Sequence, residues 1–334
     1  MRVPPRTRER ETGVRHGKQT EGGSLWAASC GGCEITVLDI AEHLLGVAAA
    51  VDLVFWPVAL DFKYQDLEAM EDKSIDLCLF NGAIRSTENR LMAERLRARS
   101  KLLIAFGSCS CMGGIPSLAN LTTSDQISQW VYADAFSCEP ANGRRPTERH
   151  LADEGVLTLP RLFNTIRTLD QTVDVDYYLP GCPPESGQVW RVLQAVLSGE
   201  LPPRGSVVGA SEKTLCEECE RTKEEKKLRR FFSLAEKTPD PDRCLLEQGI
   251  VCCGPATRGG CGARCIKANM PCRGCYGAPP GVIDQGAKLA SAISSVLEAD
   301  EPGAVDAALA TMRDPVGTFY RFGVAASLLR RARV

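Results

Sequence analysis

Three things are scarce in this sequence, and each scarcity excludes a class of protein. Its 334 residues hold only three histidines, and its 40 basic and 42 acidic residues leave a net charge of -2. Such an even balance of charges creates no electrostatic field that would attract nucleic acid or an anionic membrane. No run of eighteen apolar residues occurs, so the sequence predicts no membrane span.

The start of the chain contains no apolar segment of the kind that directs secretion. Residues 1–20 are rich in arginine and interrupted by proline, and no arginine pair precedes an apolar stretch. We therefore expect a cytoplasmic protein whose thiols stay reduced. That expectation matters because cysteine is abundant, with sixteen in the chain. In a reducing compartment, so many cysteines indicate metal binding rather than disulfides.

The chain is long enough for about two domains, and its first half alternates short β-rich runs with helical ones. This order predicts an α/β fold, a flavodoxin-like parallel sheet followed by a small domain organised by metal. The predicted strands are residues 25–29, 51–58, 75–82, 101–108 and 175–181, and the predicted helices are residues 34–50, 86–100 and 185–199.

Changes in composition divide the chain into four predicted regions. These are a basic disordered arm (1–22), the flavodoxin-like domain (23–203), a two-cluster domain (204–281) and a C-terminal helical extension (282–334). Within the second region, residues 120–174 are polar and irregular, and we interpret them as an insertion that faces a partner. The extension has helical spacing at residues 286–299, 305–314 and 324–334.

Four cysteines follow three of the predicted strands. Cys30 and Cys33 form a C-x-x-C pair after the first strand, Cys109 follows the fourth and Cys182 follows the fifth. Because the carboxyl ends of parallel strands meet at one edge of a sheet, these thiols can converge into a four-sulfur site for zinc or an iron-sulfur cube. Cys111 is an alternative to Cys109 as the ligand after the fourth strand.

Glycines accompany these cysteines and should let the backbone approach bound sulfur closely. They include Gly32 inside the C-x-x-C pair, Gly107 before Cys109, and Gly181 before Cys182. By contrast, Cys78 lies in the middle of a predicted strand, so we interpret it as a small buried apolar residue.

Nine of the sixteen cysteines lie between Cys216 and Cys275, which is enough for two four-thiolate sites with one spare. This pattern fits either a double zinc ribbon or a two-cluster iron-sulfur module, and the lack of histidine in the block favours iron. The basic run at residues 221–232 is interpreted as a solvated helix face, with a docking surface as the alternative. Glu34, beside Cys33, is expected to complement a helix dipole or to assist proton exit.

Four segments together resemble the small subunit of nickel-iron hydrogenases. They are WAASCGGCEITVLDI, IAFGSCSCMGGIPSLANL, YYLPGCPPESGQVW and CLLEQGIVCCGPATRGGCGARC with the following MPCRGCYG. The chain is most similar to the gamma subunits of the cytosolic, methyl-viologen-reducing type that associates with heterodisulfide reductase. The resemblance covers residues 25–295.

The resemblance implies three [4Fe-4S] clusters, with twelve thiols assigned, and no nickel in this chain. The implied proximal ligands are Cys30, Cys33, Cys109 and Cys182; the distal ligands are Cys216, Cys219, Cys244 and Cys252; the medial ligands are Cys261, Cys265, Cys272 and Cys275. Cys253 remains an alternative to Cys252, because the two residues are adjacent.

The resemblance also implies an electron-transfer role without a catalytic residue in this chain. Hydrogen would be split on a [NiFe] large subunit, and electrons would pass to a small iron-sulfur delta-type subunit and a flavin-containing, electron-bifurcating heterodisulfide reductase subunit. Three alternatives remain: a quinone-reductase subunit, a ferredoxin-like carrier not tied to a hydrogenase, and a structural zinc module. The first would have a single cluster, which the C-terminal cysteine block argues against.

Overall fold

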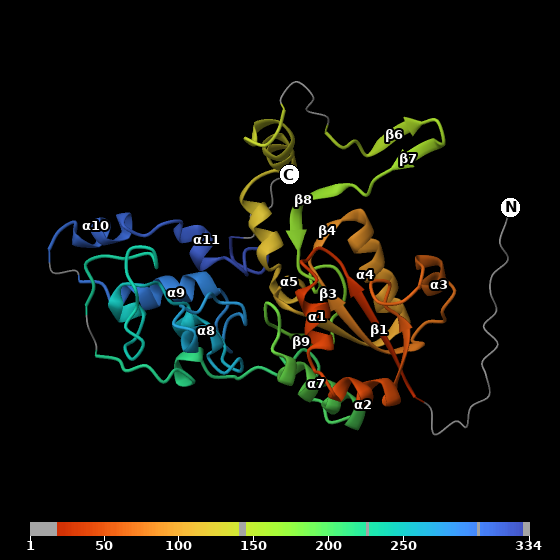
Figure 1. The fold of residues 1–334 in the computed structure, drawn as a ribbon, viewed down its shortest axis with the longest axis horizontal. Coiled ribbons are helices and arrows are strands. Elements are labelled where there is room, and N and C mark those ends of the chain that lie inside the picture. The colour runs from red at the N-terminus through yellow and green to blue at the C-terminus, as the bar shows by residue number, and fades with distance from the viewer. Residues whose placement is uncertain (1–18, 140–144, 225–226, 299–300, 330–334) are drawn as a thin grey trace.

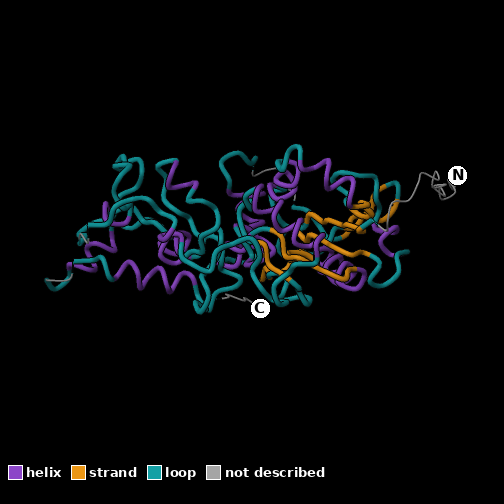
Figure 2. Tube along the Cα trace, turned by 90° about the horizontal axis from the view of Figure 1, so that it is seen from below, coloured by secondary structure: helices purple, strands orange, loops and turns teal. Residues whose placement is uncertain are grey.

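The molecule has two parts that lie side by side, a sheet domain and a part rich in loops (Figures 1 and 2). The computed structural model describes residues 19–139, 145–224, 227–298 and 301–329. The sheet domain contains five parallel strands in the order β2-β1-β3-β5-β9. They are β1 (Thr20–Trp26), β2 (Val51–Phe55), β3 (Ile75–Asn81), β5 (Ser100–Phe106) and β9 (Tyr177–Leu179). This is the flavodoxin order, which confirms the predicted fold class.

Helices cover both faces of the sheet. They are α1 (Gly32–Leu38), α2 (His43–Ala50), α3 (Tyr64–Glu68), α4 (Thr87–Arg99), α5 (Ser108–Met112) and α7 (Ser186–Ser198). Strand side chains alternate between two cores: Ile104 packs with Val37 and Val189, from α1 and α7, whereas Leu103 packs with Met92 from α4. The strand ends are therefore held from both sides.

Two predicted boundaries in this domain are wrong. The first strand starts at Thr20, not Leu25, so residues 20–22 of the expected disordered arm belong to the sheet; residues 1–18 lie outside the described residues. The predicted helix over residues 34–50 is divided into α1 and α2. The chain turns between them, and Ala41 has a φ of 55°, which a continuous right-handed helix does not allow.

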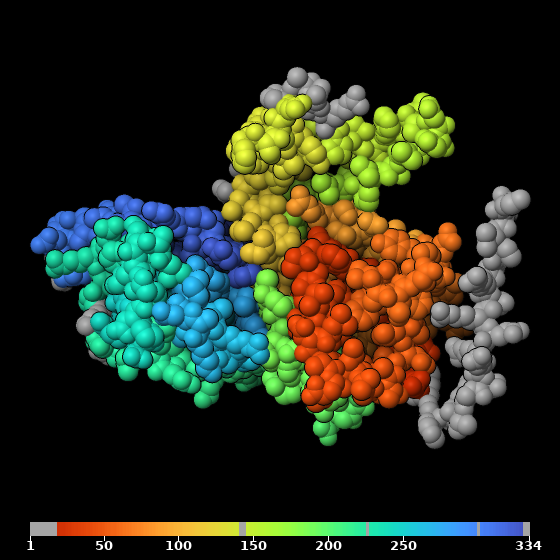
Figure 3. Space-filling model, in the orientation of Figure 1, coloured from red at the N-terminus to blue at the C-terminus, as the bar shows by residue number. Residues whose placement is uncertain are grey.

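The insertion forms structure of its own and projects from the body of the domain (Figure 3). It follows η1 (Ile115–Leu121). Its elements are α6 (Ser124–Gln129), η2 (Trp130–Asp134), the hairpin β6 (Arg149–Ala152) and β7 (Gly155–Thr158), and β8 (Leu162–Arg167), which pairs with β4 (Ile84–Ser86). The Asn120 side chain donates to the Ile166 carbonyl at 2.9 Å and accepts from its amide at 2.7 Å. This pair fixes the base of the insertion.

The loop-rich part has a hydrophobic core in addition to its cysteines. Leu215, Phe231 and Ile250 pack there with Leu289 and Ile293 from the last region of the chain. Its short elements are η4 (Leu215–Glu217), η5 (Leu246–Gln248), η6 (Gly254–Ala256), α8 (Arg264–Lys267), α9 (Gln285–Ser294), α10 (Ala304–Ala310) and α11 (Pro315–Phe319). The C-terminal helices therefore share one core with the cysteine-rich segment.

Two helices predicted in this part are missing. The basic run at 221–232 contains no helix in its described residues, since Thr222 pairs with Arg243 and Leu228 with Leu297 in isolated bridges. Residues 324–329 form turns rather than a helix, and 330–334 lie outside the described residues. None of the helices in the described ranges has the length and apolar character needed to cross a bilayer.

Candidate metal centres

Four thiols gather at the carboxyl edge of the sheet, and we call them the edge thiols. Cys30 and Cys33 lie between β1 and the first turns of α1, Cys109 lies in α5 directly after β5, and Cys182 follows β9. Burial raises the pKa of Cys33, and the neighbouring thiols Cys109, Cys182, Cys111 and Cys30 raise it further. Mutual repulsion of this kind requires the sulfurs to be close together.

Glycine lets the backbone approach two of these sulfurs. A Cβ added to Gly107, which has a φ of 84°, would lie 2.3 Å from Cys33 Sγ, and one added to Gly114 would lie 2.5 Å from Cys109 Sγ. The Gly32 amide donates to Cys30 Sγ at 3.4 Å. Gly181 serves a different purpose from the predicted one, because a Cβ there would meet the backbone of the following prolines, with Pro184 Cα at 2.4 Å.

Cys111 and Cys78 have surroundings unlike those of the edge thiols. The Cys111 thiol donates to the Ala105 carbonyl at 3.2 Å and packs in the core beneath α4. Cys78 is fully buried in the middle of β3, and burial raises its pKa to about 12. Both thiols therefore belong to the apolar interior, and the geometry favours Cys109 for the edge site.

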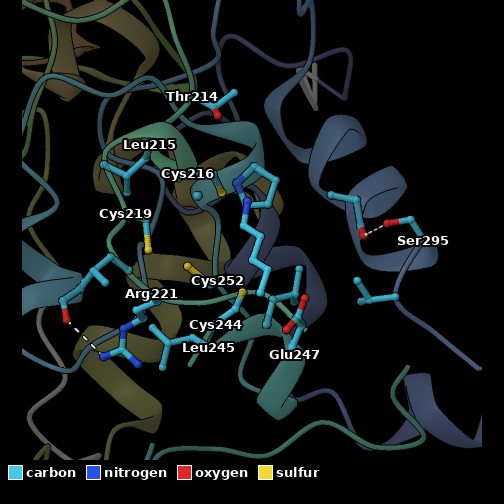
Figure 4. Close-up of a pocket in the computed structure, with 17 residues that line it drawn as sticks. Thr214, Leu215, Cys216, Cys219, Arg221, Cys244, Leu245, Glu247, Cys252 and Ser295 are labelled. Atoms are coloured by element: carbon cyan, nitrogen blue, oxygen red, sulfur yellow. Dashed lines mark hydrogen bonds between the residues drawn. The ribbon is translucent and has the colours of Figure 1, made fainter. Parts of the chain in front are cut away.

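A second group of four thiols lines a cavity of about 360 Å³ in the loop-rich part (Figure 4). We call Cys216, Cys219, Cys244 and Cys252 the pocket thiols. A Cβ added to Gly254 would lie 3.1 Å from Cys216 Sγ and 3.7 Å from Cys252 Sγ, so this glycine also gives the backbone access to sulfur. Sequence reasoning missed it, although its position directly after a cysteine pair was a usable signal.

Arg221 also lines this cavity and was missed, because it was grouped with the solvated basic run. It is 8% exposed, and its guanidinium donates to the carbonyls of Asp240, Arg243 and Ile266 and to Asn269 Oδ1. Among the described residues, no acceptor meets its buried Nε and no carboxylate pairs with it. A buried cation held only by neutral oxygens favours negative charge nearby.

The remaining four predicted ligands, which we call the middle thiols, lie between the other two groups. They are Cys261, Cys265, Cys272 and Cys275. Burial raises the pKa of Cys275 to about 12. The neighbouring thiols Cys182, Cys261 and Cys265 also raise this pKa, whereas the backbone amide of Cys182 lowers it. Burial also raises the pKa of Cys272, and the nearby Cys252 thiol raises it further. The middle thiols thus lie near the edge group on one side and near the pocket group on the other.

Polar contacts hold the middle thiols against the sheet domain. Ser108 Oγ donates to the Cys275 carbonyl at 2.5 Å. The Tyr276 hydroxyl donates to Gln188 Oε1 at 2.6 Å and accepts from the Glu185 amide at 3.2 Å. Because these groups are largely buried, the contacts fix the spacing between the two parts of the molecule.

Cys253 is not part of the pocket group. Its backbone amide donates to the Cys272 carbonyl at 3.0 Å, its side chain is 3% exposed, and it does not line the cavity. Burial raises its pKa to about 12, and Arg273 and Arg321 lower it. The structure therefore favours Cys252 over Cys253 as the cavity ligand.

Glu34, in the first turn of α1, is 4% exposed and faces the core beside the edge thiols. Burial raises its pKa, while the neighbouring polar groups of Trp56, Ser24 and Asn81 lower it. The Ser24 hydroxyl lies 3.3 Å from the Glu34 carboxylate. A buried position is not needed for a charge that only complements a helix end on the surface.

The donor set of all three groups suits thiolate-bound metal. Burial makes the free thiols hold their protons, so metal binding would release protons and form anionic ligands. Among the described residues, no three histidine, cysteine or acidic side chains close around a point where a single ion would sit. In the pocket group, four thiols line one cavity, an arrangement that matches a cluster whose ligands bind different irons.

Comparison with known proteins gives consistent matches. A family model described as "NADH ubiquinone oxidoreductase, 20 Kd subunit" matches residues 30–196. The iron-sulfur subunit of the F420-non-reducing hydrogenase of Archaeoglobus profundus is 40% identical over 283 residues, which cover 83% of this chain and 88% of that relative. A subunit of the F420-non-reducing hydrogenase of Methanothermobacter marburgensis is 36% identical over 314 residues, covering 92% and 95%.

Among solved structures, a chain of an NAD⁺-reducing [NiFe]-hydrogenase in the H2-reduced state is 28% identical. The match covers 55% of this chain and 94% of that one, with a TM-score of 0.48. The similarity to the Methanothermobacter marburgensis relative extends well beyond the sheet domain, since a match over 92% of this chain includes all twelve thiols of the three groups.

Proposed function

This chain belongs to the iron-sulfur small subunits of the F420-non-reducing [NiFe] hydrogenases, and we propose that it conducts electrons between the large subunit and an electron-accepting partner. It is thus a component of an oxidoreductase that acts on H2. The bond chemistry belongs to the large subunit, because this chain would supply metal ligands and no catalytic residue. When bound, iron-sulfur clusters would supply one-electron carriers.

We assign one [4Fe-4S] cluster to each thiol group. The edge thiols would hold the proximal cluster, the middle thiols the medial one and the pocket thiols the distal one. The fit is supported by the four-thiol donor sets and by the glycines Gly107, Gly114 and Gly254, where a side chain would collide with sulfur or crowd it. Nickel would be held by the large subunit only.

The observation that carries the proposal is the order of the thiol groups. Ser108, next to Cys109 of the edge group, donates to the Cys275 carbonyl, and Cys253, next to Cys252 of the pocket group, donates its amide to the Cys272 carbonyl. The three groups therefore form a continuous series through the molecule. The glycine-rich edge of the sheet would meet the large subunit at one end of this series. At the other end, the cavity of the pocket thiols is open to a partner.

The partner is proposed to be a small delta-type iron-sulfur subunit, which passes electrons to a flavin-containing heterodisulfide reductase subunit. The support is the similarity to hydrogenases that do not reduce F420 and so need another acceptor. All-thiolate ligation keeps each cluster anionic and favours low potentials, which suits such an acceptor in the cytoplasm.

Metal analysis of the native complex tests the proposal. We expect about twelve irons for each copy of this chain and no stoichiometric zinc, with nickel confined to the large subunit. Two or three zinc ions in colourless protein would favour the structural zinc module. Iron-loaded protein that never co-purifies with a nickel subunit would favour a free-standing electron carrier.

The insertion gives a prediction about assembly. Leu151, on the β6-β7 hairpin, is 77% exposed, and Phe136 and Trp130 nearby in the sequence are also exposed. Such an apolar surface suits a protein interface, and η1 connects it to the edge thiols through the segment after Cys109. We therefore expect Leu151→Asp to weaken binding of the large subunit about tenfold, measured by titrating one subunit against the other.

The matched control for this variant is Leu45→Asp. Leu45, on α2, has the same exposed fraction, 77%, but lies outside the insertion. It should leave the affinity unchanged. Equal losses in the two variants would show that the insertion is not part of the interface.

Arg221 gives a prediction about redox potential. Removal of its buried positive charge from the cavity should stabilise the oxidised, less negative form of the distal cluster. We expect Arg221→Met to lower the midpoint potential of that cluster by tens of millivolts, measured by redox titration with EPR detection. Arg204→Met is the control, because that arginine is largely exposed and pairs with Asp176 in the sheet domain. A distal potential that does not change in Arg221→Met would contradict this role.

A further inference from the structure

A second cavity in the loop-rich part lies outside the three thiol groups. It has a volume of about 300 Å³ and is lined by residues 231–234, 250, 251, 271, 273, 311–314, 318 and 321. None of the described residues that line it is a cysteine. Half of the residues that line it are apolar, namely Phe231, Phe232, Leu234, Ile250, Val251, Pro271 and Met312. The cavity is therefore large enough for a small organic molecule.

The charged side chains that line this cavity are mainly cationic. They include the guanidinium groups of Arg273, Arg313 and Arg321 and, among the described residues, a single carboxylate, that of Asp314. The carboxylate is already engaged, because Asp314 Oδ1 accepts from the Gly317 amide at 2.9 Å and caps α11. The cavity thus has an excess of positive charge.

Two of the three arginines lack an anionic partner. Neither Arg273 nor Arg321 forms a hydrogen bond or ion pair with another described residue, and the Arg321 Nε is fully buried without an acceptor. Arg313 is 77% exposed and reaches Glu236 only at 3.9 Å. A buried guanidinium nitrogen without an acceptor is costly, so a bound anion would be favourable here.

Arg273 and Arg321 come from segments far apart in the sequence, yet both line this one cavity. Two guanidinium groups that line one cavity can donate hydrogen bonds to the oxygens of a phosphate group, which carries nearly two negative charges at neutral pH. The apolar walls match an uncharged organic body attached to it.

We propose that this cavity binds the phosphate group of a small organic anion. Arg273 and Arg321 hold the phosphate, Arg313 completes its charge at the rim, and Phe231, Ile250 and Met312 contact the organic body. No thiol among the described residues lines this site, although Arg273 directly follows Cys272 of the middle group, and the site does not depend on the proposed electron transfer.

Calorimetric titration of the intact complex in phosphate-free buffer tests this site. The two probes are inorganic phosphate and phenyl phosphate, and the expected stoichiometry is one molecule for each copy of this chain. Phenyl phosphate should bind more tightly, because its ring contacts the apolar walls. Arg321→Gln should weaken both probes about tenfold or more. Arg191→Gln, which replaces an exposed arginine on α7, should leave both affinities unchanged.

The iron content of each variant reports whether the protein is folded and loaded. If Arg321→Gln does not fold, Arg313→Gln is the second variant, since it changes only the rim and should weaken binding several-fold. Absence of saturable binding to the wild-type complex would overturn the proposal, as would equal affinities of the wild type and a folded arginine variant. Phenyl phosphate binding no more tightly than phosphate would overturn the assignment of an organic ligand.

Discussion

Gly107→Ala is expected to prevent assembly of the proximal cluster. The added methyl group would lie 2.3 Å from Cys33 Sγ, and the residue has a φ of 84° that disfavours any side chain. Because neither the strand before Gly107 nor α5 after it can move without disturbing the sheet, the sulfur must give way. Iron should fall from about twelve to about eight per chain, with loss of the proximal EPR signal.

Gly205→Ala provides the matched control. Gly205 has nearly the same φ, 86°, but no described atom lies within 4 Å of an added Cβ. It therefore tests a side chain at a similar positive φ without a collision with sulfur. If both variants lose the same amount of iron, the effect comes from backbone strain and not from the approach to Cys33.

Cys252→Ser should remove the distal cluster, whereas Cys253→Ser should leave it intact. Cys252 lines the cavity with the other three pocket thiols, and Cys253 does not. Serine oxygen is a poor replacement for a thiolate ligand. The first variant should contain about eight irons per chain and the second about twelve.

Activity should separate these two variants as well. In Cys252→Ser, electron delivery to the partner should fall by at least about a hundredfold, because the terminal carrier is gone, while hydrogen isotope exchange at the large subunit should persist. Cys253→Ser should retain both activities. The reverse result, with iron lost only from Cys253→Ser, would make Cys253 the ligand.

The location of the edge site could be predicted because it follows from topology. Cys109 and Cys182 each come after a strand with a strong β pattern, and the carboxyl ends of parallel strands meet at one edge. The start of β1 could not be predicted in this way. Its first residues include Gly22 and Gly23, which have low β propensity, and the pairing of β1 with β2 shifts register between them.

The surroundings of the pocket thiols were harder to predict, because they depend on contacts between distant residues. Arg221 lies in a strongly charged run, and charged side chains are rarely buried. Here it donates hydrogen bonds to carbonyls up to 45 residues away. Likewise, the break between α1 and α2 depends on one residue, Ala41, whose positive φ has no local sequence signal. Local patterns contain no information of this kind.

The shared core of the loop-rich part has a consequence for the order of biosynthesis. The sheet domain has all its strands once Leu179 has been made, so it can fold while the rest of the chain is still on the ribosome. The loop-rich part cannot do so, because Leu215 and Ile250 pack with Leu289 and Ile293, which are synthesised later. We therefore expect iron to enter the edge thiols first, and the other eight thiols to stay exposed to oxidation until translation is nearly complete.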